Sequence, residues 1–206
     1  MVTFTTKAGT GFIARDRFET LHGVALARSN DSTYPAMTAL HVEDKWIAAS
    51  DGRRLHYCRN HYDLVAGEYT VTQCTRTAVT VEPRTADEIE KTGSFPNWRR
   101  VLPHKIASAF SINFSKDSRT AISDIIAILR RTPINPDYLK DLPLTNYRVY
   151  LQPDRISSNG TPIPQAALFR NRDLRAVIMP MQIASAPAGN RVYEPKDRSI
   201  VGRVIA

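Results

Sequence analysis

Short β-prone runs separated by tight turns dominate the first half of this sequence, and they limit its fold more than any other feature. Asp51-Gly52 and Ala66-Gly67 supply turn residues between runs that alternate apolar and polar side chains. This alternation favours half-buried antiparallel strands over helices. We therefore predict an α+β fold built on antiparallel sheets with few helices. The predicted strands of this half are Thr3–Thr6, Gly11–Ala14, Ala36–Val42, Trp46–Ala49, Arg54–Cys58, Glu68–Gln73 and Ala78–Val81.

Three segments have helical patterns instead. Arg15–Asn30 carries apolar residues at helical spacing, and Ser118–Arg131 places isoleucines and a leucine at positions i, i+3, i+4 and i+7. A shorter helix is predicted over Pro136–Leu142, with Asn135 available as its N-cap.

The pattern changes near Pro103, where we place a domain boundary. The preceding residues, Thr92–Pro103, are rich in turn formers. The strands predicted after them are Tyr147–Leu151, Ala166–Phe169 and Leu174–Ile183. The expected division is a first domain over residues 1–103, a second over 104–183 and a C-terminal extension over 184–206.

The net charge of +8 is concentrated in the second half. Residues 1–103 hold 13 Lys/Arg against 12 Asp/Glu, a net of +1, whereas residues 104–206 hold 15 against 8, a net of +7. An excess of this kind favours a polyanionic partner such as duplex DNA. Phosphate contacts carry no sequence information, so the expected binding is nonspecific.

Residue patterns typical of catalysis are missing from the sequence. The five histidines do not form a zinc-binding arrangement, and no Gly-x-Ser-x-Gly elbow or complete phosphate loop occurs. We therefore expect no enzyme activity, no cofactor and no metal; a nuclease would rest on basic charge alone. Cys58 and Cys74 are predicted to be free thiols, which suits the cytoplasm. The sequence has neither a signal-peptide pattern nor a stretch of about 20 apolar residues, so no membrane association is expected.

Three separated segments resemble one protein family. Ile47–Leu55 (Ile-Ala-Ala-Ser-Asp-Gly-Arg-Arg-Leu) is similar to a strand-turn-strand that ends Thr-Asp-Gly-His-Arg-Leu. Phe95–Pro103 (Phe-Pro-Asn-Trp-Arg-Arg-Val-Leu-Pro) is similar to Phe-Pro-Asp-Tyr-Arg-Arg-Val-Leu-Pro. Val177–Ile183 (Val-Ile-Met-Pro-Met-Gln-Ile) is similar to Val-Val-Met-Pro-Met-Arg-Leu. In this order, the three motifs are those of the bacterial DNA polymerase III beta subunit, the sliding clamp.

The resemblance implies a sliding-clamp fold with two clamp-like domains. Residues 1–103 would correspond to the middle domain of the family and residues 104–183 to a reduced last domain, while the usual first domain is missing. Residues 184–206 continue past the normal family end. A two-domain chain could form a trimer that keeps six domains in the ring, or a dimer as in conventional clamps.

The resemblance also implies a groove that receives short linear motifs of a DNA polymerase and a clamp loader. Apolar residues would form its walls, and Arg54 and Arg100 would supply hydrogen-bond donors. Gln182 replaces the usual arginine. The groove residues expected are Ser50, Gly52, Arg54, Leu55, Pro96, Arg100, Val101, Val177, Ile178, Met179, Pro180, Met181 and Ile183.

Basic residues on helices would face the DNA, as they do in the family. Arg119 and Arg130 lie on nearly one face of the predicted helix 118–131, and Arg17 and Arg28 share a face of the predicted helix 15–30. The expected function is a processivity clamp that encircles duplex DNA as a homo-oligomer. The alternative is an adaptor or decoy that keeps the groove without encircling DNA.

Overall fold

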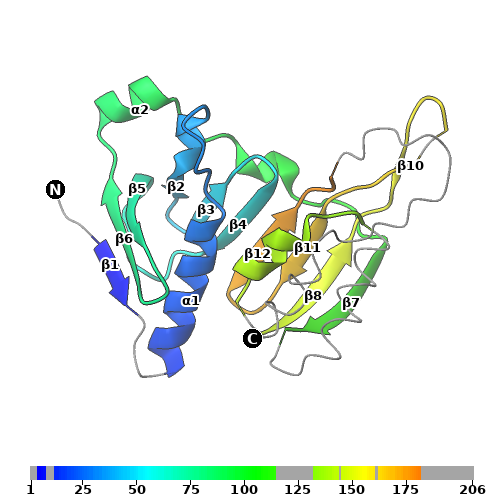
Figure 1. The fold of residues 1–206 in the computed structure, drawn as a ribbon, viewed down its shortest axis with the longest axis horizontal. Helices are drawn as coiled ribbons and strands as arrows, with labels where there is room; N and C mark the ends of the chain where they lie inside the picture. The colour runs from blue at the N-terminus through cyan, green and yellow to red at the C-terminus, as the bar shows by residue number, and fades with distance from the viewer. Residues whose placement is uncertain (1–3, 8–11, 115–131, 144, 161, 182–206) are drawn as a thin grey trace.

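The computed structural model describes residues 4–7, 12–114, 132–143, 145–160 and 162–181 (Figure 1). Their main feature is one antiparallel sheet of ten strands in the order β1-β6-β5-β2-β3-β4-β12-β11-β8-β7. The N-terminal half-sheet contains β1 (Phe4–Lys7), β2 (Ala39–Val42), β3 (Trp46–Ser50), β4 (Arg54–Arg59), β5 (Gly67–Cys74) and β6 (Ala78–Pro83). The C-terminal half-sheet contains β7 (Ser108–Asn113), β8 (Asn146–Leu151), β11 (Ala167–Arg170) and β12 (Leu174–Ile178). The short strands β9 (Arg155–Ile156) and β10 (Pro162–Ile163) form a separate pair.

The two half-sheets join where β4 pairs with β12. Leu55 lies opposite Val177, and Arg54 lies opposite Ile178. Directly opposite residues on paired strands point to the same face of the sheet. Each face of the join is therefore built from both halves of the sequence, and the candidate site described below depends on this.

Helix α1 (Phe12–Leu26) covers one face of the sheet and organises the main core. It packs on β3, β4, β5, β6 and β12. The buried side chains of Leu21 and Val24 enter a core cluster that continues into the C-terminal half-sheet as far as Ile178. The predicted helix was right in its centre. The strand predicted over Gly11–Ala14 is wrong, because the helix begins at Phe12.

Most predicted strands are confirmed, with errors at two prolines. The strand expected over Ala36–Val42 begins only at Ala39, because Pro35 starts a 3-10 turn, η1 (Pro35–Thr38). The strand expected to reach Ile183 ends at Ile178. Pro180 has no N–H to continue the ladder and instead makes an isolated bridge to Ile134.

Several elements were not predicted. Helix α2 (Ala86–Thr92) begins with a capping box in which Thr85 and Glu88 bond reciprocally, a signal present in the sequence as Thr-x-x-Glu. The 3-10 helix η2 (Trp98–Val101) and strands β7, β9 and β10 were also missed. The short helix predicted after Asn135 is confirmed as the 3-10 helix η3 (Pro136–Asp141), capped by the Asn135 side chain.

Two predictions lie outside the described residues: the helix over 118–131 and the extension over 184–206. The division into domains at residue 103 stays a prediction.

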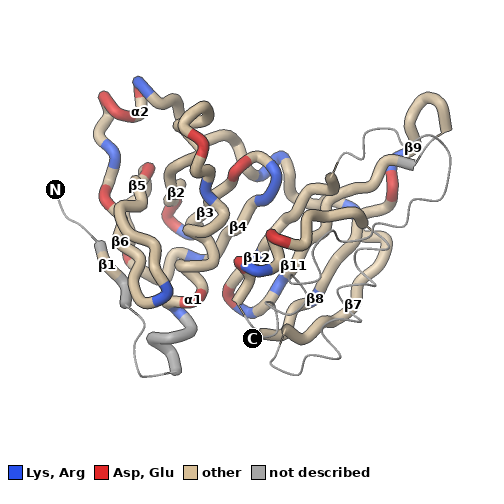
Figure 2. Tube along the Cα trace, viewed as in Figure 1, with Lys and Arg blue, Asp and Glu red and all other residues tan. Residues whose placement is uncertain are grey.

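Basic and acidic positions are mixed over the N-terminal half-sheet and α2 (Figure 2). Among the described helices, none combines the length and apolarity needed to cross a bilayer.

Candidate partner-binding surface at the sheet junction

The three motif segments meet on the face of the β4–β12 join opposite α1. A second, smaller core cluster lies there. It combines Leu55 of the first segment, Phe95 and Trp98 of the second, and Val177 of the third. Residues more than a hundred positions apart in the sequence thus form one apolar cluster, which is what the resemblance led us to expect.

Glu68 anchors the start of the second segment. The Phe95 backbone N–H donates to the Glu68 carboxylate at 2.7 Å, and the Phe95 ring stacks on His41 with centroids 5.3 Å apart. Arg84 lies 3.9 Å from the other carboxylate oxygen of Glu68. These contacts fix residue 95 against β2 and β5, so the chain crosses the face of the sheet along a defined line.

Trp98 holds the middle of the same segment. Its ring packs on Tyr57 with centroids 4.9 Å apart, and its Nε1–H donates to Glu43 at 3.2 Å. Arg99 forms an ion pair with Glu43 and lies over the Trp98 ring. Hydrogen bonding from Arg99 lowers the pKa of Glu43. The Arg99 side chain is therefore held by Glu43 and Trp98. The Arg100 side chain on the same turn is exposed.

Exposure divides the predicted groove residues into a floor and a rim. Leu55 and Val177 are almost fully buried, at 2% and 1% exposure, beneath the second segment. Val101 and Met179 are 41% and 38% exposed, and Pro96 is also exposed. We call this set the junction patch: Leu55 and Val177 as floor, and Pro96, Val101 and Met179 as rim. Pro180 and Met181 are half-buried.

Ser50 and Gly52 shape the hairpin that carries Leu55. The Ser50 hydroxyl donates to the Arg54 carbonyl at 2.7 Å and accepts from the Gly52 N–H at 3.1 Å. Asp51 accepts from the backbone N–H groups of Arg53 and Arg54. Gly52 has φ of +84°, which favours glycine. These residues position the patch by fixing the turn.

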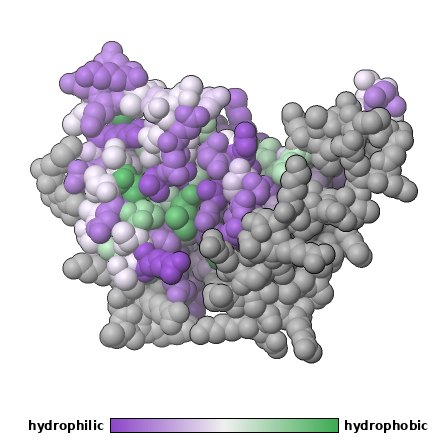
Figure 3. Space-filling model, in the orientation of Figure 1, coloured by the Kyte–Doolittle hydropathy of each residue, from purple (hydrophilic) through white to green (hydrophobic). Residues whose placement is uncertain are grey.

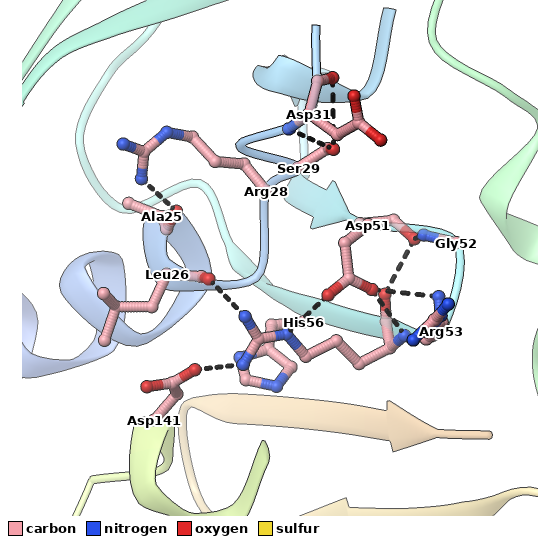
Figure 4. Close-up of polar contacts among 12 residues, drawn as sticks. Ala25, Leu26, Arg28, Ser29, Asp31, Asp51, Gly52, Arg53, His56 and Asp141 are labelled. Carbon is pink, nitrogen blue, oxygen red and sulfur yellow. Dashed lines mark hydrogen bonds and ion pairs between the residues drawn. The ribbon is translucent and has the colours of Figure 1, made fainter. Parts of the chain in front are cut away.

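Arg54 does not contribute to the patch, and the structure corrects that prediction. Its partners Leu26, Asp51 and Asp141 are drawn in Figure 4. Its guanidinium points toward α1 and η3, where it donates to the Leu26 carbonyl at 2.8 Å and pairs with Asp51 and Asp141. It also lies over the Tyr138 ring at 4.6 Å from the centroid. Strand alternation explains the error, because adjacent residues of β4 point to opposite faces.

Ile178 is corrected for the same reason. It is fully buried in the main core on the α1 face, so a partner on the opposite face cannot touch it. Arg53, which was not predicted, is exposed at the hairpin, and its carbonyl accepts the Met179 N–H at 2.8 Å. Counting outward from Leu55 by strand alternation could have indicated Arg53 instead of Arg54.

His56 is a fully buried ionisable group beside the join. Its Nδ1 lies 2.7 Å from the Gly23 carbonyl, and since a carbonyl can only accept, Nδ1 carries the proton. Nε2 has no hydrogen-bond partner among the described residues. Burial lowers the pKa of His56 to about 4, so the ring is neutral at physiological pH.

The four arginines expected to face DNA do not lie in equivalent places. Arg17 is exposed on α1. Arg28 lies beyond the end of α1 and donates to the Ala25 carbonyl at 2.8 Å, so the two do not share a helix face, and that prediction is wrong. Arg119, Arg130 and the predicted groove residue Ile183 lie outside the described residues.

The described residues hold no cluster of three or more metal-ligating side chains. Cys58 is a buried free thiol, while Cys74 is half-buried. Figure 3 shows the side of the molecule seen in Figure 1, where the described surface is mainly hydrophilic with only small apolar areas.

No protein-family model matches this sequence, and no curated protein sequence matches it. Solved structures do match. The DNA polymerase III beta subunit of Thermotoga maritima is similar with a TM-score of 0.51 at 12% identity, over 89% of this chain and 66% of that one. The Pseudomonas aeruginosa subunit gives 0.50 at 15% identity, over 88% and 67%. The Borrelia burgdorferi subunit gives 0.52 at 9% identity, over 89% and 64%.

These likenesses confirm the predicted fold: the chain has the sliding-clamp fold. It spans about two thirds of the length of the clamps it matches.

Proposed function

We propose that this chain is a relative of the bacterial sliding clamps that tethers partner proteins to duplex DNA and performs no chemistry of its own. The observation that carries the proposal is the junction patch. Segments far apart in the sequence form one buried apolar cluster on this face of the β4–β12 join, and the exposed apolar side chains of the patch come from the second and third of these segments. Exposed apolar patches of this kind mark binding sites for short peptide motifs. DNA polymerase and clamp loader are the proposed partners.

The ends of the sheet support assembly into a ring. Within the described residues, β1 and β7 are the two edge strands, and they lie at opposite sides of the molecule (Figure 1). Exposed edge strands are templates for pairing with another chain. Pairing of β1 in one copy with β7 in the next would be a head-to-tail contact, which closes into a ring when the rotation between copies allows it. We propose a homo-oligomer, a trimer or a dimer.

DNA would contact the α1 face of such a ring. That face is opposite the junction patch, so a partner and DNA would not compete for one surface. Arg17 is exposed on α1, and the chain carries a net charge of +8. Contact through phosphates alone is independent of sequence, which sliding requires.

Two measurements test encirclement. Light scattering of the full chain should give the mass of a trimer or dimer at micromolar concentration. Protein loaded on a nicked circular plasmid should be retained, and it should be lost when the plasmid is linearised. A monomeric mass together with equal retention on both DNA forms would contradict the ring. Such a result, with peptide binding intact, would favour the adaptor instead.

A further inference from the structure

The four strands of the C-terminal half-sheet carry only three charged residues, and all three are arginines. They are Arg148 on β8, Arg170 on β11 and Arg175 on β12. Arg175 lies directly opposite Arg170, and Arg170 directly opposite Arg148. Opposite residues share a face, so the three form a row across adjacent strands, which we call the arginine row. At about 4.8 Å between strands, the row spans roughly 10 Å.

The arginine row lies on the face of the junction patch. Arg175 is two residues before Val177 on β12, and Tyr57 opposite it is two residues after Leu55. A second row runs parallel to it: Val177 lies opposite Leu168, and Leu168 opposite Tyr150. The face therefore presents an apolar row and a cationic row side by side, about 7 Å apart along the strands.

No carboxylate among the described residues forms an ion pair with the arginine row. Like charges directly opposite each other on neighbouring strands are destabilising, so the row is a cost to the isolated protein. Elsewhere on this face, Arg84 and Arg99 have the partners Glu68 and Glu43, and Arg59 of β4 lies over the Trp46 ring. The acidic positions described in the second half lie outside the strands, in η3 and in turns, and one of them, Asp173, lies in the turn between β11 and β12 (Figure 2).

We propose that the arginine row binds an acidic segment of the same partner polypeptide that docks on the junction patch. The inference rests on the proposed function and names a further chemical requirement of the partner. An extended peptide rises about 3.3 Å per residue, so three or four residues beside the apolar motif, rich in Asp or Glu, would cover the row. The ligand needs apolar and anionic groups close together, as a polypeptide provides.

Two other occupants fit the row less well. Single-stranded nucleic acid is held largely by bases stacking on aromatic faces, and here three of the rings on this face are already covered by guanidinium groups. Arg175 lies over Trp46 and Tyr57, and Arg99 over Trp98. The chain's own residues 184–206 hold four Lys/Arg against two Asp/Glu, so their net charge is of the wrong sign.

The test compares two fluorescent peptides on the full chain. Both carry one clamp-binding motif from a bacterial replicative polymerase; one continues with four Asp/Glu residues and the other with four Ser. The variant is Arg148→Gln with Arg170→Gln, both exposed. The matched control is Arg155→Gln with Arg172→Gln, which removes the same charge from exposed positions off the row. Arg175 is left intact because it packs on aromatic rings.

The acidic peptide should bind the wild-type chain about fivefold to tenfold more tightly than the Ser peptide at low salt. The row variant should bind the two peptides with equal affinity, at the level of the Ser peptide. The control variant should keep the tighter binding of the acidic peptide. Equal binding of both peptides by the wild type would overturn this inference and leave the proposed function standing. Failure of both peptides to bind would contradict this inference and the proposed function together. A single-stranded oligonucleotide that needs Arg148 and Arg170, with peptide binding unaffected by their loss, would assign the row to nucleic acid instead.

Discussion

On one face of the β4–β12 join, Arg54, His56 and Ile178 lie toward α1 and η3, with His56 and Ile178 fully buried and Arg54 half-buried. On the other face, the same strands present Leu55 and Val177 beneath a rim of exposed apolar side chains. Neighbouring residues of one strand therefore lie on faces with different roles. The face toward α1 packs the two half-sheets together, and the opposite face is the surface that we propose binds a partner.

The difference separates the contacts that hold the two half-sheets together from the surface that we propose binds a partner. Pairing β4 with β12 brings distant segments together, and the α1 side supplies the buried area and the polar contacts that fix them. Substitutions on the two faces should consequently separate stability from binding.

Adjacent residues of the third segment should give the largest contrast. Ile178→Ala leaves a cavity in the main core and should lower the free energy of unfolding by about 2–5 kcal/mol. Met179→Ala, at a half-exposed position, should lower it by less than about 1 kcal/mol. Met179→Ala should also weaken binding of a clamp-binding peptide about fivefold or more. Urea denaturation and fluorescence anisotropy measure the two quantities; equal destabilisation by both variants would break the comparison.

His56 makes the inner face sensitive to acid. Its folded pKa of about 4 lies below the ordinary value of 6.5, so protonation favours the unfolded chain. Stability from this group is complete above pH 6.5 and should fall by about 3 kcal/mol as the pH drops toward 4. The measurement is urea denaturation from pH 8 to pH 4 for the wild type and His56→Gln. If the free energy of unfolding of His56→Gln fell with pH between 6.5 and 4 as steeply as that of the wild type, His56 would not be the cause of the acid sensitivity.

Arg54 and Arg53 test the polar part of the same division. Arg54→Met leaves Asp51, Asp141 and the Leu26 carbonyl without their shared donor, and should cost about 2–3 kcal/mol of stability. Arg53→Met, the matched control at an exposed position, should stay within about 0.5 kcal/mol of wild type. Thermal and urea melts would contradict the assignment if the two variants proved equally stable.

The outer face should show the smallest stability effect. Arg99→Ala removes an exposed ion pair with Glu43 and should cost less than about 1 kcal/mol, because solvent screens such pairs. A larger loss in urea denaturation would mean that the second segment is held mainly by Arg99 and not by Trp98 and Phe95.

The sequence was sufficient for much of the fold. Turns at Asp51-Gly52 and Ala66-Gly67 punctuate period-two runs, and the strands between them were found nearly to the residue. Errors arose where a proline altered a run: Pro35 replaced the expected strand start by a turn, and Pro180 ended β12. Strand β7 alternates apolar and polar residues only over Phe110–Asn113, a run at the lower limit for recognising a strand.

The candidate site was predictable as a set of segments but not as a surface. Motif similarity brought Leu55, Trp98 and Val177 together correctly. It did not by itself separate Arg54 from Arg53 or Ile178 from Met179, because neighbouring residues of a strand point to opposite faces. The arginine row was invisible for a different reason, since its members become neighbours only through the register in which β8, β11 and β12 pair.

Methyl NMR of the full chain during titration with a clamp-binding peptide from a bacterial replicative polymerase tests the junction patch most directly. Signals of Val101 and Met179 should shift progressively and saturate, with smaller shifts for Leu55 and Val177. Ile178 and Val24, on the α1 face, should stay in place. Shifts confined to the α1 face, or none at saturating peptide, would contradict the assignment of the patch as the partner-binding surface.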